Sequence, residues 1–413
     1  MNERIGRLLA ANFLLRSTGA AMGVVVALYL TRINAQVRPV TALEVSLIVV
    51  VSYTVVELTL SPFAGALSDR YGSRSLLLLG VMLAAAGVQL TAFTTATVVL
   101  LVTRLLVGFG DGLTTPLLLK QLTALTAGHD ERRARVMTLF ELTTLLSFAL
   151  GSTLGGFALD HLGKSVFSGL ALLYLLTWPL LWSQQLYQHE RLATGAEAIP
   201  WSRYLHLLRQ PQLWRFAPAW LALNTVLGLW LSQSAFQLGG PVAPGQALVG
   251  KFDERQVSLI FAGYGIVILI GLLLWARLLP GRRKTNVMLV ALAGMVSASL
   301  AILVLNSPEL TSAQRPVVLV WLTASVIVET GFTPAMLVFL GDVSDLGAWG
   351  RGALMGLYNV LLNAGQLLGA WLGAAAVGWA AINGLSWATI GLCALSIGFV
   401  LSLRSTEQSP PTE

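Results

Sequence analysis

The sequence predicts an all-α membrane protein with twelve transmembrane helices in two pseudo-symmetric bundles of six. Hydrophobic residues make up 55% of its 413 positions and charged residues 11%, whereas a soluble domain carries roughly 25% charged residues. Apolar runs of about 20 residues, the length that crosses a bilayer as a helix, recur along the whole chain. A constant sequence offset also relates helices of the first half to helices of the second.

The apolar runs place the helices. The first run continues to Leu30, about 22 residues, which is too long for the core of a signal peptide and indicates a first spanning helix. A polar stretch with two prolines, residues 188–212, is the predicted linker between an N-terminal bundle at 1–187 and a C-terminal bundle at 213–403, which a polar tail follows at 404–413. The twelve expected helices cover residues 8–31, 43–68, 75–95, 97–120, 133–159 and 165–187, then 213–238, 255–278, 285–306, 315–340, 350–378 and 381–403.

Basic residues predict the orientation of these helices. Arginine and lysine gather in the loops on one side, which include both termini and the linker, and loops rich in these residues face the cytoplasm. We therefore expect a multi-pass protein of the plasma membrane, in a bacterium the inner membrane, with both termini in the cytoplasm. The net charge of +7 is spread thinly over many loops, so it predicts topology and not nucleic-acid binding.

The sequence holds no recognisable catalytic or metal-binding pattern. Its single cysteine, Cys393, excludes an intrachain disulfide and a cysteine-based metal site. All four histidines fall in predicted loops or in the linker, and neither a P-loop nor a nucleophile elbow is present. We therefore expect no enzymatic activity, no cofactor and no metal ion.

A charged loop separates the second and third apolar runs. It reads Gly65-Ala66-Leu67-Ser68-Asp69-Arg70-Tyr71-Gly72-Ser73-Arg74, and its two glycines are the residue type that lets one helix end and the next begin within a few residues. The segment resembles the loop between helices two and three of the major facilitator superfamily, G-x-L-x-D-R-x-G-R-[RK], with Ser73 in place of one basic residue. The residues expected to act in gating are Gly65, Asp69, Arg70, Gly72 and Arg74.

Two further stretches resemble motifs of the same superfamily. The segment from Arg104 to Gly110 resembles R-x-x-x-G-x-G of helix four. On the fifth predicted helix, Gly151, Gly155 and Gly156 resemble part of G-x-x-x-G-P-x-x-G-G, a motif associated with exchangers, and serines replace its first glycine and its proline. Small residues at four-residue spacing allow close helix packing, but the missing proline weakens the inference of export.

The resemblance covers nearly the whole chain and implies both a fold and a mechanism. Members of this superfamily pack two six-helix bundles, with helices one, four, seven and ten lining a central cavity. They act as secondary transporters by alternating access. By the same resemblance, the charged loop would latch the cytoplasmic side in the outward-open state, with Asp69 and Arg70 contacting the end of a neighbouring helix.

The two halves match at an offset of 218 residues. One offset serves two pairs of helices without a gap, which indicates duplication. Parallel repeats of this kind place a substrate site near the bilayer midplane. The matched pairs are Gly151 and Gly369, Gly155 and Gly373, Asp111 and Glu329, and Glu141 and Asn359.

Charged side chains inside the predicted helices mark the candidate site. Each costs at least ~2.5 kcal/mol at the bilayer centre, and four carboxylates beside two arginines cannot all stay ionised without a bound proton or cation. Two roles remain open for each residue: an acid can carry protons or only join helices by hydrogen bonds, and Arg104 can serve transport or pin helix ends through carbonyl groups. The candidate proton-coupling or substrate residues are Arg16, Glu57, Arg104, Asp111, Glu141 and Glu329, and the polar residues expected to line the cavity are Asn224, Tyr264, Asn359 and Asn363.

These observations lead to one expected function and two alternatives. We expect a proton-coupled transporter that exports an amphipathic or drug-like compound. The alternatives are proton-coupled uptake of an organic solute and a non-transporting role as a partner in the assembly of a membrane complex. The expected partners are a small-molecule substrate, protons and the lipid bilayer, without nucleic acid. The chain is expected to be a monomer, with a membrane-complex partner left open.

Overall fold

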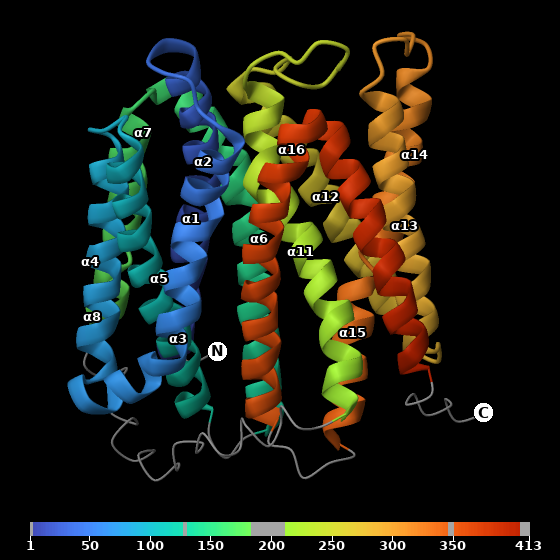
Figure 1. The fold of residues 1–413 in the computed structure, drawn as a ribbon. Helices are drawn as coiled ribbons and strands as arrows, with labels where there is room; N and C mark the ends of the chain where they lie inside the picture. Colours follow the sequence, from blue (N-terminus) through green and yellow to red (C-terminus); the bar gives the residue numbers. More distant parts are fainter. Residues whose placement is uncertain (1–2, 127–129, 183–210, 346–350, 405–413) are drawn as a thin grey trace. The chain divides into compact units, whose positions relative to one another are not determined.

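A computed structural model describes residues 3–126, 130–182, 211–345 and 351–404 (Figure 1). Over these ranges the chain is helical and contains no strand, which confirms the predicted fold class. Two compact units form, one from Met1–Ala198 with Asp253–Ala262 and the other from Ile199–Phe252 with Gly263–Glu413. The predicted linker at 188–212 lies outside the described residues up to 210, and the predicted tail lies outside them beyond 404.

Helices of the first unit follow the predicted runs. The second run is built from three joined segments, because a π-helical segment, η1, lies between two α-helices. The sixth run is interrupted after Leu175, where the ring of Pro179 would clash with the carbonyl four residues earlier. The helices are α1 (Glu3–Gln36), α2 (Ala42–Ser46), η1 (Leu47–Val51), α3 (Ser52–Tyr71), α4 (Ser73–Thr91), α5 (Thr97–Leu125), α6 (Asp130–Leu162), α7 (Ser165–Leu175) and α8 (Trp178–Trp182).

The second unit contains two helix interruptions. Pro334 ends α14 by the same clash, here with the carbonyl of Thr330. The long helix α16 has two non-helical residues, Ala380 and Ala381, which divide it into a rising and a returning arm (Figure 1). The helices are α11 (Pro211–Gly239), α12 (Glu254–Leu278), α13 (Lys284–Leu305), α14 (Arg315–Glu329), α15 (Phe332–Asp345) and α16 (Arg351–Leu403). The start of α12, up to Ala262, belongs to the first unit.

The predicted count of twelve spans is not fully confirmed. Each predicted span overlaps a helix, a joined pair of helices or one arm of α16. Within the described ranges, ten helical segments are long and apolar enough to cross a membrane. This total counts the arms of α16 together as Val360–Leu403 and does not include α11.

In the first unit, α1 packs against α6 through small residues. A β-carbon added at Gly151 would collide with the backbone of Ser17, and one added at Gly155 would lie 2.9 Å from the carbonyl oxygen of Ala21. One turn before Gly151, Ser147 donates a hydrogen bond of 3.0 Å to the carbonyl of Phe13. The backbones of the two helices can approach this closely only because these side chains are small or absent.

In the second unit, α11 and α16 repeat this contact. A β-carbon added at Gly369 would collide with the backbone of Thr225, and one at Gly373 would lie 3.1 Å from the carbonyl oxygen of Leu229. Gly369 and Gly373 are the positions that the offset of 218 residues assigns to Gly151 and Gly155. The repeat read from the sequence therefore corresponds to the same helix contact in both units.

We predict that Gly369→Ala destabilises the chain although alanine favours helices. The added methyl group has no space against Thr225, and overpacking of this kind costs about 1–3 kcal/mol. Gly391 lies in the same helix with nothing within 4 Å of an added β-carbon, so Gly391→Ala should be neutral or stabilising by up to about 1 kcal/mol. Thermal unfolding of the purified variants in one detergent measures both effects, and equal melting temperatures would contradict the close contact.

Candidate functional site

The structure brings together most of the charged residues predicted for the first unit. Arg16 on α1 interacts electrostatically with Glu57 on α3 and with Asp111 on α5. Its guanidinium donates a hydrogen bond of 2.8 Å to the hydroxyl of Thr115, one turn beyond Asp111. In the described part of this unit, the direct contact of Arg16 is therefore a hydroxyl group, while the two carboxylates act on it from a greater distance.

Asp111 is held in the interior of the unit, where its side chain is 6% exposed. Gly19 of α1 faces it, since an added β-carbon there would lie 3.7 Å from Oδ2 of Asp111 and 3.6 Å from the hydroxyl of Tyr174. The absent side chain at Gly19 thus leaves space beside the carboxylate. Arg16 lies one turn earlier on the same helix, so one face of α1 presents both a cation and an open position to Asp111.

Glu141 on α6 occupies the edge of this cluster. Its side chain is exposed, and its carboxylate interacts electrostatically with Arg16. Close by on the same helix, Thr143 and Thr144 accept hydrogen bonds of 3.0 Å and 3.1 Å from the amide of Asn12. Arg16 is therefore the common neighbour of the carboxylates on α3, α5 and α6.

Arg104 contacts the backbone, and its charge also acts on Asp111. Its side chain is 4% exposed, and it donates hydrogen bonds of 3.0 Å and 3.1 Å to the carbonyls of Ile48 and Val49 in η1. The π-helical turn leaves carbonyl groups that a regular helix would use internally, and the guanidinium satisfies them. Of the two roles that the sequence left open for Arg104, this geometry favours the anchoring one.

The glycines that follow Arg104 have packing roles. A β-carbon at Gly108 would lie 2.7 Å from the carbonyl oxygen of Tyr53 on α3, and one at Gly80 would lie 2.8 Å from that of Gly110. The segment from Arg104 to Gly110 thus holds α5 against η1, α3 and α4. It supports the cluster around Arg16, and Arg104 adds a second positive charge that acts on Asp111.

In the second unit, Glu329 stands at the end of α14, where the helix is interrupted. Its carboxylate is partly buried and accepts a hydrogen bond of 3.4 Å from the hydroxyl of Tyr264. No described cation acts on it, unlike Asp111, which faces Arg16. The predicted correspondence of Asp111 and Glu329 is therefore altered locally, because α5 continues through Asp111 whereas α14 stops at Glu329.

The predicted cavity residues of the second unit are dispersed. Asn224 is 2% exposed, and its amide donates to the carbonyl of Trp220 in its own helix. Asn363 is partly buried on α16, and Tyr264 pairs with Glu329. The side chain of Asn359 lies outside the described part of the chain.

The charged loop differs in one respect from the sequence expectation. Gly65 does not end a helix, because α3 continues through it to Tyr71. The reversal occurs at Gly72, whose φ of 81° suits glycine, and α4 begins at the next residue. The guanidinium carbon of Arg74 lies 4.4 Å from the ring centroid of Trp182, whereas the side chain of Asp69 is outside the described part.

Comparison with known proteins identifies the family. The sequence model of the Major Facilitator Superfamily matches residues 8–243 and again residues 225–413. The chain belongs to this superfamily. Among solved structures, the nucleoside transporter NupG is 14% identical with a TM-score of 0.75, over 98% of this chain and 99% of the other. A POT family transporter in complex with 5-aminolevulinic acid is 15% identical with a TM-score of 0.71, over 99% and 96%.

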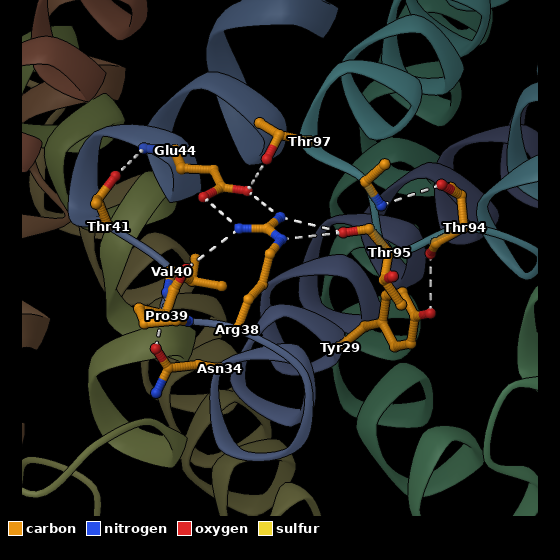
Figure 2. A network of polar contacts seen from close by, with 11 residues as sticks. Tyr29, Asn34, Arg38, Pro39, Val40, Thr41, Glu44, Thr94, Thr95 and Thr97 are labelled. Atoms are coloured by element: carbon orange, nitrogen blue, oxygen red, sulfur yellow. Dashed lines mark hydrogen bonds and ion pairs between the residues drawn. The ribbon is translucent and has the colours of Figure 1, made fainter.

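A second polar network lies at the start of α2, and the sequence analysis did not predict it. Arg38 donates hydrogen bonds to both carboxylate oxygens of Glu44, at 2.9 Å and 2.5 Å, and a further one of 3.1 Å to the carbonyl of Thr95 (Figure 2). Thr97 donates to the same carboxylate at 2.7 Å. The hydrogen bond with Glu44 raises the pKa of Arg38 above its usual range.

This network joins the connection before α2 to the connection before α5. Its sequence signal is a capping box, Thr41-Ala42-Leu43-Glu44, in which the Thr41 side chain accepts from the amide of Glu44 at 3.2 Å. A second ion pair lies at the end of α1, where Arg32 donates to Glu254 at 2.7 Å and to the carbonyl of Leu159 at 3.2 Å. In the described residues no group of three or more His, Cys, Asp or Glu side chains is arranged to hold a metal ion.

We predict that Arg104→Lys lowers the melting temperature. A lysine keeps the charge but cannot donate to two carbonyls in a fixed fork, and each carbonyl left unsatisfied in the interior costs about 1–3 kcal/mol. Arg282→Lys, at an exposed arginine, is the matched control. A variant that melts like the wild type but loses transport would instead assign Arg104 to the transport step.

We also predict that Arg38 and Glu44 stabilise the chain as a pair. Glu44→Gln and Arg38→Gln should each cost about 1–3 kcal/mol, since each leaves a partly buried charge without its partner. The double variant should cost less than the sum of the two. Thermal unfolding of the four proteins measures this coupling, with the exposed Glu309→Gln as control. Strict additivity would show that the two side chains act independently.

Proposed function

We propose that this chain is a secondary active transporter that moves a small organic solute by alternating access, coupled to the movement of protons. The observation that carries the proposal is the cluster in the first unit, where Arg16 faces the carboxylates of Glu57 and Asp111. Glu141 also acts on Arg16, and Arg104 acts on Asp111, so three carboxylates lie beside two cations and one negative charge is uncompensated. In a low-dielectric interior this charge is relieved by a bound proton or by a bound cation.

Asp111 is the proposed proton carrier. It is more buried than Glu57 or Glu141, and the absent side chain at Gly19 leaves a gap the size of a methyl group beside its carboxylate. When a proton is bound to Asp111, the two arginines balance Glu57 and Glu141, and the site can close without enclosing a net charge. When the proton leaves, the restored charge favours a site that is open to water.

Glu329 is the proposed second titrating position. It has a tyrosine hydroxyl as its partner and no described cation, so its carboxylate also depends on a proton or a cationic group for neutrality. Glu329 lies at the interruption between α14 and α15, where the helix can change direction. Neutralisation of its carboxylate can therefore be coupled to a movement of these helices. We propose that Glu329 binds the solute or a second proton during the same cycle.

The charged loop completes the proposed mechanism. We propose that residues 65–74 form a cytoplasmic latch, with both chain termini on the same side of the plasma membrane. The backbone supports a rigid turn, since α3 and α4 are separated only by Gly72. Lys120 of α5 donates a hydrogen bond of 2.6 Å to Ser68 in the last turns of α3, which connects this segment to the helix that carries Asp111.

Export of an amphipathic compound is the first proposed direction, and uptake of a small polar organic solute is the second. The nucleoside transporter that shares the fold supports a small organic solute in either direction. The two differ in the sign of the coupling. During export, an inward proton gradient should drive solute out of the compartment that the linker faces, whereas during uptake the same gradient should drive solute into it.

We predict that Asp111→Asn abolishes the dependence of transport on a pH gradient while solute exchange survives. The amide keeps the shape of the side chain but cannot release a proton. Proteoliposomes with an imposed pH gradient measure the coupled flux, and counterflow without a gradient measures exchange. The solute used is one selected from a metabolite and drug panel by ligand-dependent thermal stabilisation. Glu141→Gln should give a weaker form of the same change, because Glu141 is exposed.

Three outcomes separate the possibilities. If Asp111→Asn transport still accelerates with the gradient as in the wild type, Asp111 is structural and the coupling acid is Glu57 or Glu329. If both assays fail in a variant that melts like the wild type, Asp111 binds the solute itself. If the wild type neither exchanges nor transports any compound that stabilises it, the non-transporting role in a membrane complex replaces the proposal.

A further inference from the structure

The second unit contains a cavity away from the intramembrane carboxylates. Its volume is about 560 Å³, and the connection between α11 and α12 forms one wall while the start of α14 forms another. Pro244 and Pro308 contribute apolar surface, and Gln246, Lys251 and Arg315 contribute polar groups. The cavity therefore combines an apolar wall with two cationic side chains.

The cavity wall is held in place by Asn306 at the end of α13. This residue is 1% exposed, and its amide donates to Gln246 at 2.7 Å and to Asn383 at 2.8 Å. Its carbonyl oxygen atom Oδ1 accepts from the backbone of Leu248 at 2.9 Å. Gln246 in turn donates to the carbonyl of Ala380 at 2.9 Å. A surface connection with this many fixed bonds keeps its shape before any ligand arrives.

The charge of the cavity is positive and uncompensated. Lys251 and Arg315 make no ion pair within the part of the chain that the structure describes. No acidic side chain lines the cavity, and Glu309, which follows Pro308, is exposed outside the lining. Two cations that share one cavity repel each other, so an anion that contacts both is attracted more strongly than either charge alone would attract it.

We propose that this cavity is a binding site for a phosphate group carried by a small organic molecule. Arg315 supplies a planar fork that matches two phosphate oxygens, and Lys251 supplies a point charge. The apolar wall suits the carbon skeleton to which the phosphate is attached. Two sources share this chemistry: a soluble phosphate ester and the headgroup of an anionic phospholipid. The site is distinct from the cluster around Arg16, so it does not depend on the proposed transport cycle.

The test is a ligand titration on the purified full chain. In neutral detergent at constant ionic strength, glycerol 3-phosphate should raise the melting temperature of the wild type in a saturable way. A second arm uses nanodiscs of phosphatidylcholine with and without phosphatidylglycerol. In Lys251→Gln/Arg315→Gln, the apparent affinity in whichever arm responds should fall by about tenfold or more, as expected for the loss of charge-assisted hydrogen bonds.

Two control variants make the result specific. Arg277→Gln/Arg282→Gln removes the same charge from two exposed arginines outside the cavity and should keep the response. Lys251→Arg/Arg315→Lys keeps both charges and should also keep most of it. A response confined to glycerol 3-phosphate identifies a soluble ligand, and one confined to phosphatidylglycerol identifies a headgroup. No response in either arm, or an equal response in Lys251→Gln/Arg315→Gln, overturns the proposal.

Discussion

Close contact between helix backbones is the constraint on which the rest of this structure depends. In a bilayer the apolar surface of a helix gains little by leaving lipid, so helices associate where small residues let their backbones touch. Gly151 and Gly155 create such a contact between α6 and α1, and Gly369 and Gly373 create it between α16 and α11. The contact fixes the rotation of α1 and α11 and thereby determines which of their side chains face the interior.

The repeated contact shows where the two units differ. In the first unit, Gly151 contacts Ser17, and the residue before Ser17 is Arg16. In the second unit, Gly369 contacts Thr225, and the residue before Thr225 is Asn224. The packing is shared, but a guanidinium stands in one unit where an amide stands in the other. The carboxylates follow the same division, since Asp111 has a cation near it and Glu329 has a tyrosine. Two copies of one scaffold thus hold acids of different electrostatic character.

Much of the fold could be predicted from the sequence because a bilayer requires apolar runs of fixed length. Charged residues buried in such runs were also visible, and the structure brings Arg16, Glu57, Asp111 and Glu141 together. The partners of Arg104 could not be predicted, since backbone carbonyls carry no sequence signal. The sequence predicts the interruption of α16 as a gap between two apolar runs, and the non-helical residues Ala380 and Ala381 lie between Gly378 and Gly384. By contrast, the capping box at Thr41 was readable and was overlooked.

The interruption of α16 also affects how the second unit is made. A straight helix of 53 residues would be about 80 Å long, far more than the roughly 30 Å of hydrocarbon that it has to cross. Ala381, at a φ of 48°, reverses the chain, and the returning arm carries Cys393, Val400 and Leu403 into the core formed with α11, α13 and α15. During synthesis this core stays incomplete until the returning arm has emerged from the ribosome. Lipid, or a factor that shields nascent membrane helices, therefore has to cover this open face until nearly all of the second unit has been translated.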